Sequence, residues 1–206
     1  MARGRLITIE GLDGAGKTTQ AAGLVEELSS RGVPVRLLRE PGGVEVSERV
    51  RALVTDPRVS VAPRAEALLY AAARAQLVEE LVEPLLAEGT WVVLDRFVDS
   101  SLAYQGGGRG LGVEAVRAVN EFATGGLVPD RTVFLRVDLQ TGRERQGARG
   151  SEPDRLERED SEFFAAVARA YEEIAAADPA RVRVVDASGS PEAVRAAVAG
   201  AVSDLR

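Results

Sequence analysis

The residue types best suited to chemistry lie near the start of the chain, where residues 11–18 read Gly-Leu-Asp-Gly-Ala-Gly-Lys-Thr, a complete G-x-x-x-x-G-K-T pattern. In such a loop the backbone N–H groups point inward at phosphate oxygens, and side chains at the glycines would obstruct them. Lys17 can reach the β- and γ-phosphates, and the Thr18 hydroxyl can join the coordination shell of Mg²⁺. The pattern predicts a nucleoside triphosphate site formed by Gly11, Leu12, Asp13, Gly14, Ala15, Gly16, Lys17 and Thr18.

A second polar pair, Asp95 and Arg96, directly follows the apolar residues 91–94. Open α/β sheets bind their ligands at the carboxyl edge of the strands, so this pair is expected at a binding site. The Asp95 carboxylate can orient Mg²⁺ through water or hold Thr18, and Arg96 can clamp the phosphate of an acceptor beside the donor. The alternative is a surface ion pair that ends a strand.

The elements that must position these residues follow an alternating pattern. Strand-like runs recur at 5–10, 34–39, 90–95, 131–137 and 181–186, and stretches with helical periodicity separate them. An apolar run precedes the glycine-rich loop, and Ala21, Leu24, Val25 and Leu28 follow it at helical spacing, so strand, loop and helix occur in the required order. We therefore predict an α/β fold, a three-layer sandwich whose five-stranded parallel sheet is flanked by helices.

Composition narrows the function classes. The 206 residues, 45% of them hydrophobic, indicate one domain over residues 1–206. The formal charge of −6 gives no support for nucleic-acid binding, and no apolar run approaches the ~20 residues that span a bilayer. The first residues pass into a strand without the apolar segment of a signal peptide, so we expect a cytoplasmic protein without a membrane partner.

The sequence contains neither histidine nor cysteine. Disulfides and thiolate metal sites are therefore excluded, and the usual general base is missing. Phosphoryl transfer to an acceptor that is itself a phosphate needs no base, because a phosphomonoester with a second pKa near ~6 is mostly dianionic at pH 7.

Together these stretches resemble one family, the bacterial thymidylate kinases, nearly from end to end. The resemblance depends on residues 10–19 at the phosphate loop, Arg-Glu-Pro-Gly-Gly at 39–43, Asp95-Arg96, Tyr-Gln-Gly-Gly-Gly-Arg-Gly at 104–110 and Asp-Arg-Leu-Glu at 154–157. It implies transfer of the γ-phosphate of ATP to dTMP, with Mg²⁺. It also implies a homodimer, by family analogy alone.

The resemblance assigns roles on the base side of the acceptor. Tyr70 would stack on thymine, and Arg74 would hydrogen-bond its O4; many relatives have Phe at the position of Tyr70. Ser101 would contact the N3 edge, although Thr or Asn is often found there. The alternative for Tyr70 and Arg74 is an amphipathic helix with an interfacial tyrosine and a solvated arginine.

The resemblance also assigns residues to the sugar and the phosphate. Tyr104 would disfavour a 2′-hydroxyl, and Asp13 would lie near the 3′-hydroxyl. Arg39 and Arg51 match positions around the acceptor nucleotide, and Arg51 is the preferred phosphate ligand of the two. Their alternative is that both are solvated surface arginines.

Transition-state charge must be met by donors that arrive when the site closes. Some bacterial members of the family lack an arginine inside the phosphate loop and supply one from a lid instead. This chain resembles that subtype, because Gly14 occupies the loop position where others carry Arg, and residues 141–156 would form the lid. Arg149 is our first candidate and Arg145 the second; the alternative is a charged helix face held by ordinary ion pairs. We predict a mobile loop from Gln146 to Asp154. Asp186, after the last strand, is expected beside adenine.

Two other functions stay open at this point. One is another nucleoside monophosphate kinase or a deoxynucleoside kinase of similar fold. The other is a nucleotide-dependent switch or ATPase with the same phosphate loop. The acceptor residues have no purpose in a switch, and the sequence has no typical guanine-specifying N-K-x-D.

Overall fold

A computed structural model describes residues 3–148 and 153–205 of the chain. Its five strands form one parallel sheet in the order β2-β3-β1-β4-β5. Their bounds are β1 Leu6–Gly11, β2 Val35–Arg39, β3 Trp91–Asp95, β4 Arg131–Arg136 and β5 Val182–Asp186. Each strand begins and ends within one residue of its predicted range, and the predicted fold class is confirmed.

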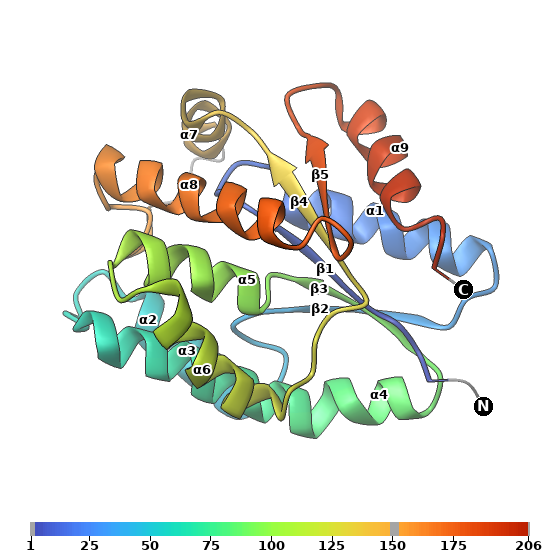
Figure 1. The fold of residues 1–206 in the computed structure, drawn as a ribbon, viewed down its shortest axis with the longest axis horizontal. Helices are drawn as coiled ribbons and strands as arrows, with labels where there is room; N and C mark the ends of the chain where they lie inside the picture. The colour runs from blue at the N-terminus through green and yellow to red at the C-terminus, as the bar shows by residue number, and fades with distance from the viewer. Residues whose placement is uncertain (1–2, 149–152, 206) are drawn as a thin grey trace.

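Helices connect the strands and cover both faces of the sheet (Figure 1). Their bounds are α1 Lys17–Ser30, α2 Glu45–Thr55, α3 Pro63–Leu77, α4 Glu83–Ala87, α5 Val98–Ser101, α6 Val113–Thr124, α7 Leu139–Gly147, α8 Ser161–Ala177 and α9 Pro191–Ala201, with π-helical turns η1 Val78–Val82 and η2 Leu102–Gly108. Within the described part of the chain, no helix is both long and apolar enough to cross a membrane.

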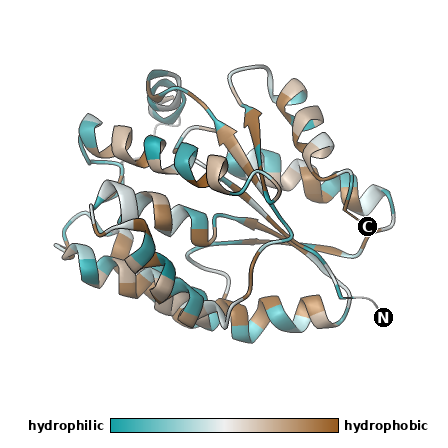
Figure 2. Ribbon diagram, viewed as in Figure 1, coloured by the Kyte–Doolittle hydropathy of each residue, from teal (hydrophilic) through white to brown (hydrophobic). Residues whose placement is uncertain are grey.

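The three layers follow from the alternation of buried residues along the strands. Ile7 and Ile9 pack with Leu24 of α1 and Val198 of α9, whereas Leu6 packs on the opposite face. That second face is covered by α3, η1 and α4 over β2 and β3, and by η2 and α8 over β4 and β5. Figure 2 shows largely hydrophobic strands between helices that carry both hydrophobic and hydrophilic residues. Burial on both faces explains the near-continuous apolar runs of the sequence.

The helical stretch before β3 contains a wide turn. The backbone is helical from α3 through η1 to α4, and the π-helical turn η1 lies directly before α4, which carries Pro84 as its second residue. A proline ring inside a helix clashes with the carbonyl four residues earlier and lacks an N–H to donate. The wider turn accommodates this residue, so the local disturbance of the helix lies just before Pro84.

The predicted loop from Gln146 to Asp154 is wrong at its beginning, because Gln146 and Gly147 are the last residues of α7. The Asp138 carboxylate caps this helix by accepting from the Thr141 N–H at 2.9 Å. One glycine at the end of a helix lowers its stability without stopping it earlier. Residues 149–152, which include Arg149, lie outside the described residues.

Candidate active site

The loop between β1 and α1 lies under the first turn of α7. Gly14 has φ 81°, and a Cβ atom there would lie 2.1 Å from the carbonyl oxygen of Gly142. Gly11 has φ 142°, and a Cβ there would lie 2.6 Å from the Leu135 carbonyl oxygen. Both glycines are therefore required by neighbouring backbone in addition to their own conformation. The sequence pattern did not reveal that the helix at the start of the predicted lid touches the loop.

The start of α1 offers its backbone to an anion. Among the described residues, no side chain caps its first turn, so the N–H groups there are available to phosphate oxygens. Lys17 is buried, and its Nζ donates to the Leu12 carbonyl oxygen at 2.9 Å and lies 3.6 Å from Asp13. Burial, with the nearby Arg96 charge, lowers the pKa of the Lys17 ammonium to about 8. A phosphate group at this place would complete its ion pairing.

Two side-chain oxygens that could bind a metal ion meet beside the loop. The Thr18 hydroxyl donates to the Asp95 carboxylate at 2.6 Å, which joins the first turn of α1 to the end of β3. No group of three or more metal-ligating side chains occurs among the described residues. A hydroxyl and one carboxylate suit Mg²⁺, which is bound through few protein ligands and completes its shell with water and phosphate oxygens.

Arg96 links the phosphate loop to the acceptor side. Its Nη1 donates to the Gly11 carbonyl oxygen at 3.2 Å and to Ser100 Oγ at 3.1 Å, and its Nη2 pairs with Asp13. The guanidinium lies over the Tyr104 ring, 5.2 Å from the centroid. Arg96 has φ 72°, a left-handed conformation that costs free energy in a residue with a side chain. Its orientation is therefore set by surrounding contacts.

Asp13 is surrounded by donors and cations. Tyr104 donates its hydroxyl to Asp13 Oδ2 at 3.1 Å, while Arg96 contacts Oδ1. Burial disfavours the charged carboxylate, but Arg96 and then Lys17 outweigh it and lower the pKa of Asp13 to about 2. Asp13 is therefore an ionised acceptor over the working pH range and cannot act there as a general acid.

A cavity of about 410 Å³ opens beside these groups. It runs from the phosphate loop across the ends of β2 and β3 to α3 and η2, and Asp154, Leu156 and Glu157 close another side. The sequence-predicted residues that line it come from six separate stretches: Asp13, Lys17, Thr18, Arg39, Arg51, Tyr70, Arg74, Asp95, Arg96, Ser101 and Tyr104. The predicted acceptor residues are thus brought together in one place.

Arg74 is fixed by protein contacts on every side. Its Nε donates to Glu40 at 2.7 Å, its Nη1 donates to Ser101 Oγ at 3.0 Å and to Asn120 Oδ1, and its Nη2 donates to the Phe97 carbonyl oxygen at 2.9 Å. Nη2 also lies 2.6 Å from Glu40. A direct bond to a base would therefore replace or share one of these contacts.

The two other arginines on the β2 side are less enclosed. Arg39 pairs with Glu48 at 2.9 Å, and more than half of its side chain is exposed. Arg51 Nη1 donates to the Pro41 carbonyl oxygen at 2.9 Å. Both line the cavity. They can reorient toward a phosphate at lower cost than the buried Arg74.

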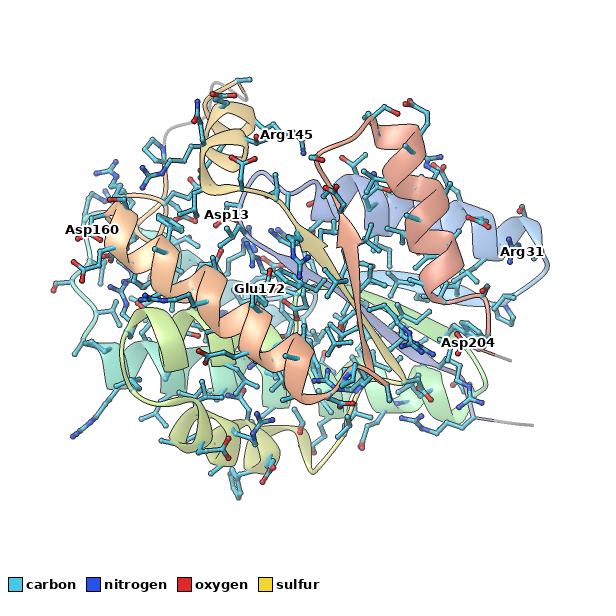
Figure 3. The ribbon with its side chains drawn as sticks, turned by 45° about the horizontal axis from the view of Figure 1, so that its top comes forward. Asp13, Arg31, Arg145, Asp160, Glu172 and Asp204 are labelled. Atoms are coloured by element: carbon cyan, nitrogen blue, oxygen red, sulfur yellow. The ribbon has the colours of Figure 1, made fainter. Side chains whose placement is uncertain are left out.

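In the described part of the predicted lid, Arg145 contacts the loop after β5, whereas Arg143 lines a cavity together with Leu12 and Asp13 of the phosphate loop. Arg145 reaches from α7 to the loop after β5, where it donates to the carbonyl oxygens of Ala187 at 2.8 Å and Ser188 at 3.2 Å (Figure 3). Asp186, predicted beside adenine, is exposed and accepts from the Ser188 N–H at 2.9 Å. Arg143 lies over the Phe164 ring, 5.7 Å from its centroid.

Sequence reasoning missed the buried acids around the site. Glu10, Glu40 and Glu66 are at most 6% exposed, and each holds one or more of the neighbouring elements. Glu66 pairs with Arg109 and with Arg155, which lies near the end of the predicted lid. The signal that was available is an acid inside an apolar run, as at the end of residues 6–10.

Comparison with known proteins places these observations in a family. The family model described as Thymidylate kinase matches residues 9–198. A thymidylate kinase of Pelotomaculum thermopropionicum is 47% identical over 204 residues, which cover 98% of this chain and 94% of the relative. The corresponding protein of Deinococcus radiodurans is 46% identical over 99% of this chain and 98% of its own length. That of Bacillus licheniformis is 46% identical, covering 93% and 91%.

Proposed function

The chain belongs to the thymidylate kinase family and phosphorylates dTMP to dTDP with ATP, and we propose that the cavity beside the phosphate loop is where it does so. The observation that supports this assignment best is the position of Arg96. Its guanidinium touches the phosphate loop at Gly11 and Asp13 and lines the cavity on its other side. One cation there can hold the acceptor phosphate next to the γ-phosphate.

The transfer itself needs little covalent participation from the protein. An oxygen of the dTMP phosphate attacks the γ-phosphorus, the bond from that phosphorus to the β,γ-bridging oxygen breaks, and ADP leaves with the electron pair. The loop N–H groups and Lys17 hold the β- and γ-phosphates, while Arg96 holds the nucleophile in line. Because the attacking phosphate is already ionised, no histidine is required.

Mg²⁺ fits the oxygen ligands at Thr18 and Asp95. When bound, it would supply charge neutralisation between the β- and γ-phosphates. Thr18 would contribute its hydroxyl, and Asp95 would act through water or by orienting that hydroxyl, as their 2.6 Å contact allows.

The base and sugar of dTMP would lie between α3 and η2. Tyr70 supplies a ring for stacking, Arg74 and Ser101 supply polar atoms for the base, and Tyr104 and Asp13 lie where the sugar is expected. Arg51, with Arg39, would contact the acceptor phosphate. Since Arg74 is already saturated with acceptors, we propose that Ser101, which shares its hydrogen bond, adjusts when the base binds.

Residues 141–156 would form the lid of this single domain. Arg145 contacts the loop after β5, which suits a role beside adenine with Asp186, so Arg149 remains our first candidate for stabilising transition-state charge. Replacing Arg149 with Ala should lower kcat by about 10³-fold and leave ATP affinity nearly unchanged. An unchanged kcat rejects this assignment.

We propose a homodimer through α2, α3 and α6. Phe122 of α6 is 91% exposed and Leu68 of α3 is 58% exposed, and α3 packs against both of the other helices. Large exposed apolar side chains are typical of a surface that is covered by a partner. Light scattering should give twice the chain mass for the wild type and the chain mass for Phe122→Glu; a monomeric wild type contradicts the proposal. For localisation, we propose the cytoplasm, in keeping with the lack of a membrane-spanning helix among the described residues.

The assignment is tested by ADP release with five acceptor conditions: dTMP, dUMP, UMP, thymidine and no acceptor. We expect the highest kcat/KM with dTMP and negligible release without an acceptor. Equal ADP release with and without dTMP would indicate an ATPase and contradict the assignment of the cavity.

A further inference from the structure

Glu10 is a carboxylate buried in the middle of the sheet. It is the last residue of β1 before Gly11, its side chain is inaccessible to solvent, and the register pairs it with Phe134 of β4. A buried charge at such a position is costly unless several donors satisfy it. The proposed reaction assigns it no role.

Three donors surround this carboxylate, and two come from the segment just after Arg96. The Phe97 N–H donates to Glu10 Oε1 at 2.7 Å, and the Ser100 hydroxyl donates to Oε2 at 2.6 Å. The Tyr171 hydroxyl of α8 donates to Oε2 at 3.1 Å. Ser100 in turn accepts from Arg96 Nη1 at 3.1 Å, so a continuous chain of hydrogen bonds runs from the guanidinium to Glu10.

These contacts hold a turn that is unfavourable by itself. Arg96 has φ 72°, and its own N–H donates to the Ile9 carbonyl oxygen at 3.1 Å. A left-handed residue with a side chain persists only where its surroundings determine the conformation. Glu10 accepts from the Phe97 N–H, which fixes the backbone after Arg96, and it accepts from Ser100, whose oxygen accepts from the Arg96 guanidinium. The two contacts fix the backbone and the guanidinium together.

We propose that Glu10 is a positioning residue for phosphoryl transfer, whose carboxylate holds the Arg96 turn so that the guanidinium lies beside the phosphate loop. The inference rests on the proposed role of Arg96 as the ligand of the acceptor phosphate. Glu10 touches no substrate in this account and acts through Phe97 and Ser100.

The charge state of Glu10 gives the proposal a distinctive readout. Burial, and then the negative charge of Asp99 on α5, raise the pKa of Glu10 to about 7, while Ser100 and Arg96 oppose the rise. Tyr171 on α8 and Lys17 on α1 also face it electrostatically. Below this pKa the Glu10 carboxyl carries a proton and becomes a donor itself, so it can no longer accept from both Ser100 and Tyr171. This weakens the chain of hydrogen bonds that leads to Arg96. Activity should therefore fall as the pH drops through about 7.

The test compares wild type with Glu10→Gln in kcat/KM for dTMP between pH 6 and 8. Glutamine keeps an acceptor for Phe97 and resembles the protonated acid. We expect a loss of about 10- to 100-fold at pH 8. With a pKa of about 7, roughly nine-tenths of the wild type is protonated at pH 6, so the loss there should shrink to about 2- to 10-fold. The ratio of wild-type to variant kcat/KM at each pH cancels the ionisation of both nucleotides. The sequence has no histidine or cysteine whose titration would add another step to the pH profile. Equal activity at pH 8, or a loss that is constant with pH, overturns the proposal.

Asp99→Asn is the matched control. Asp99 is also buried, but it accepts from Arg181 at 2.6 Å and Thr132 at 3.0 Å and does not touch the Arg96 turn. Removing the Asp99 charge should leave kcat/KM at pH 8 unchanged. The fall in kcat/KM at acid pH should then occur at a lower pH, because the pKa of Glu10 is lowered. If Glu10→Gln fails to fold, Tyr171→Phe removes a single hydrogen-bond donor from the Glu10 carboxylate. The fall in kcat/KM at acid pH should then occur at a higher pH, and an unchanged pH profile counts against the role of Glu10.

Failure of this inference can be separated from failure of the proposed function. If Arg96→Ala is inactive while Glu10→Gln matches the wild type, only the positioning role is wrong. If Arg96→Ala retains normal activity, the acceptor assignment itself fails, whatever Glu10→Gln shows.

Discussion

The phosphate loop and the side of the cavity proposed to hold the acceptor carry positive charge in opposite ways. In the loop, Lys17 donates to a backbone carbonyl, its nearest described carboxylate oxygen, on Asp13, is 3.6 Å away, and its pKa is lowered to about 8. On the acceptor side, Arg96 and Arg74 each pair closely with a carboxylate. The phosphate loop therefore has a cation that lacks full compensation, whereas Arg96 and Arg74 are held in place by ion pairs within the protein.

This difference separates binding from positioning. A phosphate that enters the loop gains from an ammonium whose charge is poorly compensated, so we expect Lys17 to contribute to ATP affinity. The acceptor arginines have already lost their side-chain freedom to internal ion pairs, so they contribute fixed geometry more than net attraction. Variants on the two sides should therefore fail in different kinetic parameters.

The largest effect is expected from Arg96→Ala, which removes the connection between the two sides. We expect kcat/KM for dTMP to fall by about 10³-fold or more, because both orientation of the nucleophile and charge stabilisation are lost. The affinity for an ATP analogue, measured by calorimetry, should change little, since Lys17 and the loop backbone are intact. Near-normal turnover of Arg96→Ala would contradict the role of Arg96 in connecting the phosphate loop with the acceptor.

A smaller loss should follow Gly14→Ala, which disturbs the donor side through packing. The added Cβ would lie 2.1 Å from the Gly142 carbonyl oxygen, so α7 and the loop must separate. A displacement of this size near the reacting groups should reduce kcat by about 10²-fold. Gly200→Ala on α9 is the control, because a Cβ there meets nothing within 4 Å. Equal kcat for both variants would mean that α7 does not need this contact.

Asn120→Leu tests whether the base side depends on pre-set geometry. Asn120 is buried on α6 and accepts from Arg74 Nη1, so the variant leaves that N–H without its partner. We expect a loss of roughly 1–3 kcal/mol in the free energy of unfolding and a rise of about tenfold in KM for dTMP. KM for ATP should stay within about twofold. A parallel rise in both KM values would show a general loss of folded protein instead.

The last expected effect, which is confined to alkaline pH, is a pH dependence of ATP affinity. Phosphate oxygens favour the ammonium, so the pKa of Lys17 rises from about 8 when ATP binds. Binding then takes up a proton above that pH, and affinity should fall by up to about tenfold per pH unit, while this group causes no change below pH 7. Lys17 is the only lysine in the sequence, so a lysine-labelled NMR titration follows it directly. Constant affinity from pH 7 to 9.5 contradicts the uncompensated charge.

The same contrast explains what the sequence could predict. The phosphate loop is one contiguous pattern between a strand and a helix, and the five strands are short apolar runs, so both were predicted closely. The acceptor side depends on pairs that are distant in the chain: Arg74 bonds to Glu40, 34 residues away, and to Asn120, 46 residues away. Spacing along one helix cannot indicate such partners, and only the family resemblance assigned Arg74 a role.

The contact between Gly14 and Gly142 shows a similar limit. Each glycine reads from the sequence as a local feature, one in a loop and one in a helix, and only the fold reveals that both permit one close backbone approach. The resemblance to known kinases predicted a lid arginine because relatives differ at the position of Gly14. The packing gives a separate physical reason for glycine at that position.

The central claim is that one cavity seats two nucleotides with their phosphates against each other and Arg96 between them. It is tested most directly by calorimetry with adenosine and thymidine joined through five phosphates. We expect this compound to bind wild type at least about 100-fold more tightly than ATP or dTMP, because linking the ligands makes the second binding event intramolecular, and to lose most of that gain in Arg96→Ala. Binding no tighter than either nucleotide alone, or a full gain in the Arg96 variant, would contradict the claim.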